Sequence, residues 1–245
     1  MNKLLLLFFL LSFNYITGQD LIEIRNVHTA DKSEEVYHAS PENENIKNGS
    51  YTYKDSTGKL ILSGSYWMNQ KDGLWTSYDS NDKVQYRGNY YHGTPVNEWE
   101  YFNSGKLIMK YNFSQNELVA IGIMDSTVNA YTLQVNGKDT IKTFTDHQAM
   151  YIGGDYFLLD YIHANVTYPL YAQKNKIGGT VYIGVTIDST GKAIDQRVLR
   201  EIGGGCDQEA MRTVRLISSN WIPAVSNGKY ITSMITIPVS FRLNK

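Results

Sequence analysis

The side chains that most often carry out catalysis are few and scattered in this chain of 245 residues. Its only cysteine, Cys206, has no histidine close to it in the sequence that could act as a base, so we expect a small, partly buried side chain and not a nucleophile. The five histidines occupy positions 28, 38, 92, 147 and 163 and match no metal-ligand spacing. No paired carboxylates indicate acid–base chemistry. We therefore expect that the protein is not an enzyme and that it needs no cofactor or metal ion.

Two loops contain residue types that bind ions in other proteins. The triple glycine Gly203–Gly205 precedes an expected helix and could cradle a phosphate, but it lacks the Lys-Ser/Thr pair of a P-loop. Asp207 and Glu209 would also repel an anion there. Asp188 could be a calcium ligand, but one carboxylate is too few for a calcium site. We therefore expect Asp188–Lys192 to be a hairpin turn.

The charge and the amino-acid composition of the chain restrict the classes of partner that we expect. The formal net charge is −1 and no block of basic residues occurs, which argues against binding to nucleic acid and against electrostatic docking to membranes. Aromatic residues make up 13% of the chain and 19 of its residues are tyrosines. Because aromatic side chains favour strands, we expect a β-rich protein.

Residues 1–18 have the pattern of a secretory signal peptide. Lys3 supplies the positive charge, Leu4–Phe13 is apolar, and small or polar residues precede Gln19, the expected start of the mature chain. The apolar run is shorter than the roughly 20 residues that span a bilayer. We therefore predict an exported protein, the alternative being an uncleaved segment that anchors the chain in the inner membrane.

An internal repeat follows a polar lead-in segment over residues 19–47. One constant shift of about 24 residues, a period typical of repeat architectures, maps Tyr51 onto Trp75 and Trp99, and Gly64 onto Gly88. Each copy also contains a turn-forming cluster between two alternating stretches, which predicts a β-hairpin. Because single hairpins are marginal in water, we expect three units over residues 48–115 to stack into one meander.

The repeats resemble MORN-type or antitoxin-like aromatic repeats, with the pattern G-x-W-x-x-Y and a later G-K turn. The third copy departs from this pattern at Pro95 and Asn97. We expect the regular aromatic side chains to pack as the core of the repeat. The alternative is that they form a platform for a peptide or a glycan.

Residues 116–148 are expected to form a β connector. Two alternating stretches, 131–135 and 139–144, flank Asn136-Gly137, a strong hairpin pattern. The sequence leaves open whether they extend the repeat sheet or lead into the last domain.

The order of elements after residue 149 predicts an α-β-β-α-β domain. Spacings of three and four between apolar residues indicate a helix over residues 155–164, with Asp155 as its cap and Phe157, Leu158, Tyr161 and Ile162 as its apolar positions. Alternation predicts strands over 180–187 and 193–199. A second helix follows Gly205, with Asp207 as its cap and an inner stripe of Ala210, Val214 and Ile217.

The last predicted strand would direct Ile235, Ile237, Val239, Phe241 and Leu243 inward. Pro238 falls on its other face. Proline cannot donate a ladder hydrogen bond, so we expect this strand to lie at an edge of the sheet with the proline nitrogen pointing outward.

Residues 149–244 resemble the C-terminal domain of TonB, in the version common in Bacteroidetes-type bacteria. The matching motifs are Tyr168-Pro169, Gly179-Thr-Val, Ile187-Asp188, Gly191-Lys192, Val198-Leu199, Gly203-Gly-Gly-Cys-Asp-Gln-Glu-Ala210, Trp221-x-Pro223, Asn227-Gly-Lys229 and Ile237-Pro-Val-x-Phe-x-Leu243. The expected architecture is therefore an all-β repeat meander followed by an α+β domain of the TonB C-terminal type over residues 149–245.

The resemblance implies a periplasmic domain that binds a short "TonB box" peptide of an outer-membrane transporter by adding it to the last strand. Carried over by motif, the contact residues of this edge are Ser233, Ile235, Ile237, Pro238, Val239 and Phe241. The segment Val166, Thr167, Tyr168 and Pro169 would lie alongside the ligand. A homodimer through the same strand, or another envelope protein as partner, is also compatible with the edge.

Two departures from a transducing TonB weaken the stronger prediction that the protein transmits energy. Such a protein has a membrane anchor and a long proline-rich spacer, whereas this chain has a signal-like segment and five prolines in total. Pro238 also removes one donor from the proposed edge. The alternative function is an envelope scaffold, in which the repeats bind protein or glycan and the TonB-like domain only docks or dimerises.

Overall fold

The computed structural model describes residues 21–121, 131–136 and 139–243. The expected signal peptide and Gly137 lie outside these residues. The chain divides into two compact units, one reaching to Trp75 and including Tyr90–Thr94, and the other comprising Thr76–Asn89 and Pro95–Lys245. In the described part, no helix is both long and apolar enough to cross a membrane.

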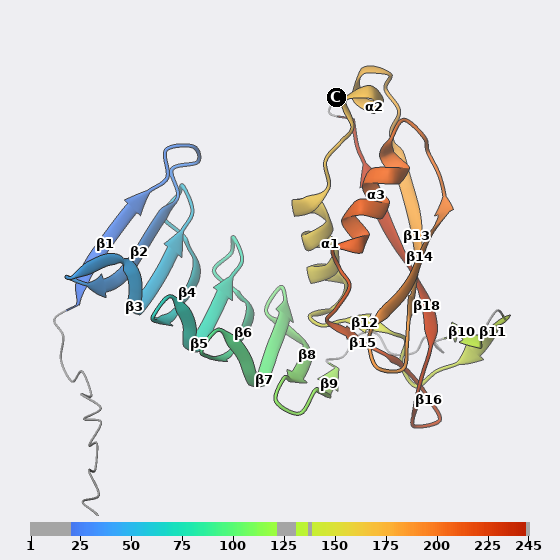
Figure 1. Ribbon diagram of the computed structural model, residues 1–245, viewed down its shortest axis with the longest axis horizontal. Coiled ribbons are helices and arrows are strands. Elements are labelled where there is room, and N and C mark those ends of the chain that lie inside the picture. Colours follow the sequence, from blue (N-terminus) through green and yellow to red (C-terminus); the bar gives the residue numbers. More distant parts are fainter. Residues whose placement is uncertain (1–20, 122–130, 137–138, 244–245) are drawn as a thin grey trace, which may run out of the picture. The chain divides into compact units, whose positions relative to one another are not determined.

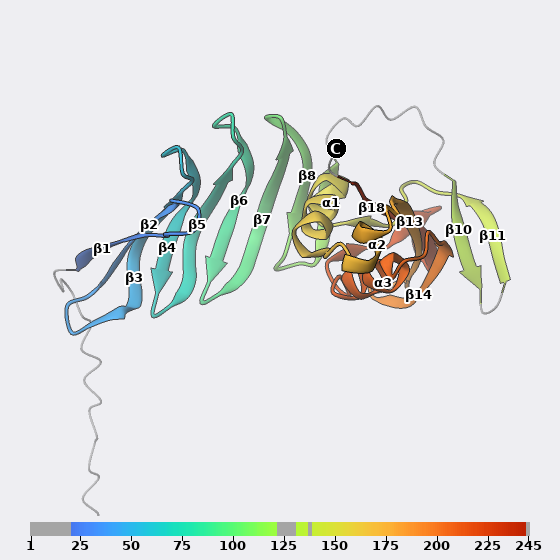
Figure 2. The same cartoon turned by 90° about the horizontal axis from the view of Figure 1, so that it is seen from above.

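Nine strands pair in chain order in the first sheet, so the expected meander is confirmed (Figures 1 and 2). They are β1 (Ile22–Val27), β2 (Glu34–Ser40), β3 (Asn43–Lys54), β4 (Leu60–Trp67), β5 (Gln70–Tyr78), β6 (Val84–Tyr91), β7 (Thr94–Asn103), β8 (Lys106–Asn112) and β9 (Glu117–Ile121). The repeat units are the hairpins β3–β4, β5–β6 and β7–β8. Their likeness to MORN-type repeats stays a prediction.

Turn chemistry and aromatic packing explain why the repeat folds this way. In the first hairpin turn the Asp55 carboxylate accepts hydrogen bonds from the backbone N–H groups of Thr57 and Lys59, at 2.8 and 3.1 Å. The pentapeptide at Asp188–Lys192 has the same sequence and makes the same bonds. The expected turn there is confirmed, because local side-chain bonds suffice to define it.

The repeated aromatic side chains are core residues, as expected. Trp75 is 0% exposed and Trp99 is 4% exposed. Their indole N–H groups donate to the backbone oxygens of Ser65 and Asn89, at 3.0 and 3.1 Å, and these acceptors also lie one repeat apart. The second and third copies therefore bury an indole whose N–H group has a hydrogen-bond acceptor, as buried tryptophan usually does.

The second sheet has the order β11-β10-β18-β13-β14. Its strands are β10 (Tyr131–Asn136), β11 (Asp139–Phe144), β13 (Gly179–Ile187), β14 (Ala193–Arg200) and β18 (Ser233–Phe241). The connector therefore divides, since β9 extends the repeat sheet while β10 and β11 join the C-terminal sheet (Figure 1).

The C-terminal part has more elements than the expected α-β-β-α-β order. Besides α1 (Gly154–Asn165) and α3 (Cys206–Arg215), a short helix α2 (Leu170–Lys174) precedes β13. Four short strands, β12 (Met150–Tyr151), β15 (Trp221–Ile222), β16 (Ala224–Ser226) and β17 (Lys229–Ile231), form two further small sheets. The expected turn at Asn227–Lys229 joins β16 to β17.

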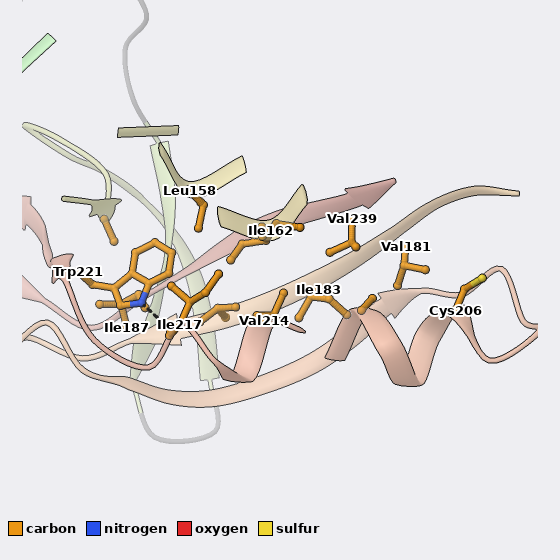
Figure 3. Packing of buried hydrophobic residues seen from close by; sticks show 14 of the residues in the cluster. Leu158, Ile162, Val181, Ile183, Ile187, Cys206, Val214, Ile217, Trp221 and Val239 are labelled. Atoms are coloured by element: carbon orange, nitrogen blue, oxygen red, sulfur yellow. Dashed lines mark hydrogen bonds between the residues drawn. The ribbon is translucent and has the colours of Figure 1, made fainter. Parts of the chain in front are cut away.

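Helices α1 and α3 cover one face of the second sheet and enclose its core (Figure 3). On β13 the alternating residues Val181, Ile183, Val185 and Ile187 are all fully buried, as expected. The helices contribute Leu158, Ile162, Ala210 and Val214, and Ile217 follows two residues after the end of α3. Burying one such Val, Leu or Ile side chain stabilises the fold by roughly 1.5–3 kcal/mol, so this layer fixes the position of β18.

Four expectations about side chains in this domain are wrong. Both helices begin after a glycine in the left-handed conformation, Gly153 and Gly205, so neither Asp155 nor Asp207 is a cap. The Asp207 carboxylate instead accepts the N–H groups of the preceding loop at Ile202 and Gly203, at 2.8 and 2.9 Å. Tyr161 and Leu243, expected to face the core, are exposed.

Candidate functional site

The last strand, β18, has different neighbours along its two sides. On one side β13 pairs with it over its whole length, from Gly179 opposite Phe241 to Ile187 opposite Ser233. On the other side β10 pairs only with Ser233 and Met234. Among the described residues, no strand pairs with the remainder of this side. The free edge, which we define as Ile235–Phe241, is thus shorter than the edge predicted from the sequence.

The backbone groups that face the free side follow from the pairing with β10. Val135 N–H donates to the Thr232 oxygen at 3.0 Å, so the groups of Thr232 point toward β10. Backbone groups of alternate residues in a strand point to the same side. The free edge therefore presents the N–H and C=O of Thr236 and Ser240, and the C=O of Pro238.

The expectation that the last strand lies at an edge of the sheet is wrong, because β18 lies between β10 and β13. Only the expected orientation of Pro238 agrees with this arrangement, because β10 is too short to reach it. The nitrogen of Pro238 points away from β13, so the missing N–H removes no bond from the sheet. Its side chain is exposed, as is that of Thr236. The proline leaves one gap in the row of outward donors between Thr236 and Ser240.

Most of the β18 side chains predicted to contact a partner point into the core. Ser233, Ile237, Val239 and Phe241 are at most 3% exposed, and Ile235 is half-buried. These residues hold the strand in place, and their backbones rather than their side chains define the edge. The Ser233 hydroxyl is buried and has no hydrogen-bond partner among the described residues.

A cavity of about 440 Å³ adjoins the free edge. It is bounded by strands β10 and β18, by the segment around β12, and by α1. Its lining residues are Thr132, Leu133, Lys142, Gln148, Ala149, Met150, Tyr151, Asp155, Leu158, Trp221, Met234, Ile235, Thr236 and Ile237. Thr236 belongs to both features, so a peptide bonded to its backbone would have this cavity beside it.

The segment Val166–Pro169 is held in place by bonds that occupy its own backbone. Thr167 N–H donates to the Glu209 carboxylate at 2.6 Å, and the Pro169 oxygen accepts the N–H of Gln173 at 3.0 Å. Val166 N–H donates to the Ile162 oxygen and ends α1. These bonds connect the segment to α1, α2 and α3.

Tyr168 of this segment packs against β18, and Val166 packs against the core to which β18 contributes. The ring centroid of Tyr168 lies 5.5 Å from that of Phe241, and its hydroxyl donates to the Ile177 oxygen at 2.8 Å. Burial of this hydroxyl raises the pKa of Tyr168. The side chain of Pro169 lies next to Gly205 at the start of α3. The segment thus supports the end of the strand, and its place alongside a ligand stays a prediction.

An ion pair fixes the segment to α3. Arg212 donates two hydrogen bonds to the Glu209 carboxylate, at 2.7 and 2.8 Å, and a third to the Asn165 oxygen at 2.7 Å. The bonds from Arg212 hold the pKa of Glu209 below its ordinary value. Glu209 therefore stays ionised at neutral pH and keeps its bond to Thr167.

Sequence reasoning missed Thr236, Ser240 and the cavity. The alternation pattern identified which face of β18 is buried, but it carries no information about which strand covers each side. The pairing of β10 with β18 joins residues that are far apart in the sequence, and no local pattern indicates it.

Comparison with known proteins agrees with the motif-based resemblance in the C-terminal part. Residues 164–243 match the family model described as "Gram-negative bacterial TonB protein C-terminal". No curated protein and no solved structure matches the chain. The match covers about a third of the chain, includes the Val166–Pro169 segment and β18, and leaves out the nine-stranded sheet.

Proposed function

We propose that the C-terminal domain binds an extended peptide by strand addition at the free edge of β18, in TonB-dependent transport across the outer membrane. The observation that carries the proposal is the uncovered backbone of Thr236 and Ser240 beside a cavity, within a domain that matches the TonB C-terminal family. In strand addition, backbone bonds supply affinity and side-chain pockets supply specificity.

The free edge admits a short peptide. Thr236 and Ser240 can each exchange two backbone bonds with an incoming strand, whereas Pro238 can only accept one. A net contribution of about 1 kcal/mol for each bond indicates modest affinity from the backbone alone. The adjacent cavity would supply the rest by taking up an apolar side chain of the peptide.

The proposed partner is an outer-membrane TonB-dependent transporter or another envelope protein, and the proposed location is the periplasm. Energy transduction is the stronger form of this proposal and requires an N-terminus that remains anchored in the inner membrane. N-terminal sequencing of the native protein in fractionated membranes tests it. A mature chain that starts at Gln19 contradicts transduction but leaves peptide binding intact.

Peptide binding is tested by titration calorimetry with synthetic peptides copied from the N-terminal segments of TonB-dependent transporters. The informative variant is Thr236→Pro, which removes an outward donor without touching the bonds to β13. We expect it to raise Kd about tenfold or more while the protein stays folded. Unchanged affinity in this variant would show that peptides bind elsewhere.

The second candidate function is the envelope scaffold, which an apolar pocket in the repeat sheet, lined by Trp67 and Met68 among others, favours. Deleting residues 48–115 is a poor test of it, because Phe157 on α1 packs against Tyr86 and Tyr101 at ring-centroid distances of 5.8 and 5.3 Å. The deletion would expose Phe157 and disturb the C-terminal domain. Point substitutions in the repeat sheet separate the two functions more cleanly, with capture of envelope partners as the readout.

A further inference from the structure

A second cavity, of about 740 Å³, lies at the ends of the first hairpins of the repeat sheet. Its lining residues are Leu21, Ser40, Glu42, Asn43, Ile46, Asn48, Gly49, Ser65, Tyr66, Trp67, Met68 and Asp72. We call it the hairpin pocket. Its volume is within the range of ligand sites, and its combination of apolar side chains with a few polar groups is typical of them.

The apolar part of the hairpin pocket includes an unusually exposed tryptophan. Trp67 is 48% exposed, whereas Trp75, Trp99 and Trp221 are at most 4% exposed. Met68 beside it is 58% exposed. Neither side chain contributes to the buried core of the repeat, so packing alone does not explain them.

The turn that carries these residues is held rigidly. Met68 and Asn69 both adopt positive φ angles, 50° and 66°. The Asn69 side-chain oxygen accepts the N–H of Lys47 at 2.7 Å, and Asn69 N–H donates to the Lys47 oxygen at 3.0 Å. These bonds fix the turn to the neighbouring strand β3, so the wall of the pocket is formed before any ligand arrives.

Some lining residues of the hairpin pocket recur in the next copy, since Gly49 corresponds to Gly73 and Tyr66 to Tyr90, but others do not. One repeat later, Trp67 corresponds to Tyr91, Met68 to His92 and Asp72 to Val96. The tryptophan, the methionine and the carboxylate of the pocket are thus specific to the first hairpins.

The charge of the lining is one-sided. Glu42 and Asp72 contribute carboxylates, and the lining includes no lysine, arginine or histidine among the described residues. Asp72 accepts one backbone N–H, from His92 at 3.3 Å. Lys47 lies on β3 between two lining residues, and its ammonium group lies over the rings of Tyr37, Tyr51 and Tyr66, the last of which lines the pocket. Its charge is already paired with Glu35.

We infer that the hairpin pocket binds a short peptide segment in which an apolar side chain is flanked by lysine or arginine. The apolar side chain packs on Trp67 and Met68, and the cationic groups pair with Glu42 and Asp72. Arginine can also stack on the indole face while its guanidinium meets a carboxylate. This site is independent of strand addition at β18, and its residues belong to the other compact unit.

The assay uses the fluorescence of Trp67, because its side chain is the most exposed of the four tryptophans. The probe is the pentapeptide acetyl-Arg-Leu-Arg-Leu-Arg-amide, and the comparison probes are acetyl-Glu-Leu-Glu-Leu-Glu-amide and chitohexaose. We expect the basic peptide to shift the emission of Trp67 and to protect it from acrylamide. Its affinity should exceed that of the acidic peptide at least tenfold in low salt and fall as salt is added.

Two matched pairs of variants locate the site. Trp67→Ala should abolish the response and weaken binding measured by calorimetry at least tenfold, whereas Tyr91→Ala, which removes the exposed ring one repeat later, should not. Glu42→Gln should weaken binding several-fold, whereas Glu44→Gln, at an exposed acid of the same hairpin outside the pocket lining, should not.

Four results would overturn the inference. They are the absence of any response to the basic peptide at millimolar concentration, equal binding of the acidic peptide, preferential binding of chitohexaose, and a Trp67 already shielded from acrylamide before any probe is added. The third result would make the pocket a glycan site, and the fourth would show that the chain itself covers it. Because none of these variants touches β18, peptide binding there can fail or succeed separately.

Discussion

Gly88→Ala tests whether the repeat core is built by close contact between a glycine and an indole ring. A Cβ atom on Gly88 would lie 2.2 Å from Cδ2 and 2.4 Å from Cε2 of Trp99. The same contact recurs one repeat earlier, where a Cβ on Gly64 would lie 2.3 Å from Cδ2 of Trp75. These distances are far shorter than van der Waals contact, so the indole or the strand must move.

The expected change in the free energy of unfolding follows from two opposing effects of the substitution. Neither glycine adopts a left-handed φ, so alanine would by itself stabilise the protein by about 0.4–1 kcal/mol through the unfolded chain. Overpacking costs typically about 1–3 kcal/mol, and displacing a fully buried tryptophan costs as much as about 3–5 kcal/mol. We therefore expect a net loss of about 2–4 kcal/mol in the free energy of unfolding.

Urea unfolding followed by circular dichroism measures this loss, and the double variant with Trp99→Phe identifies its source. If the clash is the cause, the smaller ring should relieve it, and the two substitutions should couple by about 1 kcal/mol or more. Gly58→Ala is the control, because its Cβ would meet nothing within 4 Å and only its positive φ opposes the change. A Gly88→Ala variant as stable as the parent protein would refute the packing argument.

Three further predictions concern the C-terminal domain. Pro238→Val restores the missing outward donor, so it should tighten peptide binding or homodimerisation about 2- to 10-fold, corresponding to one net hydrogen bond; calorimetry and sedimentation showing no change in either would count against the edge. Ser233→Ala removes a buried hydroxyl without a partner and should leave the free energy of unfolding unchanged or raise it by about 1 kcal/mol, whereas a clear loss of stability would reveal an unseen partner. Bonds from Arg212 lower the pKa of Glu209 in the folded protein. The ionised carboxylate therefore stabilises the fold fully above its ordinary pKa of 4.5, and this stabilisation is lost as the pH falls through the lower pKa of the folded state. Glu209→Gln should therefore flatten the decline of stability with acid below pH 4.5, and an identical acid profile would mean that the ion pair contributes nothing.

Local sequence patterns predicted those strands, helices and turns whose residues alternate or repeat over a few positions. The alternation of Val181 to Ile187 identified both the strand and its buried face, and the inner stripe of α3 was identified from its spacing. The turn at Asp188 was predictable because its hydrogen bonds lie within one pentapeptide. In each case the determining contacts are close together in the sequence.

Features that depend on partners far away in the sequence were not predictable. The strands of the β10–β11 hairpin were foreseen, but their place beside Ser233 was not, because strand pairing is not encoded in either strand alone. Asp155 and Asp207 occupy positions where a helix cap is plausible. Each helix nevertheless begins one residue before its aspartate, directly after a glycine with a left-handed backbone conformation. The repeat period related Gly64 to Gly88 without revealing that each glycine makes room for an indole.

Amide hydrogen exchange along β18 tests the central proposal most directly. In the free protein the N–H groups of Thr236 and Ser240 face the uncovered side, while those of Ile237 and Val239 bond to β13 and are already protected. Adding a peptide from the N-terminal segment of a TonB-dependent transporter should slow exchange at Thr236 and Ser240 and leave Ile237 and Val239 unchanged. Bound peptide with unchanged exchange at Thr236 and Ser240 would contradict strand addition at this edge.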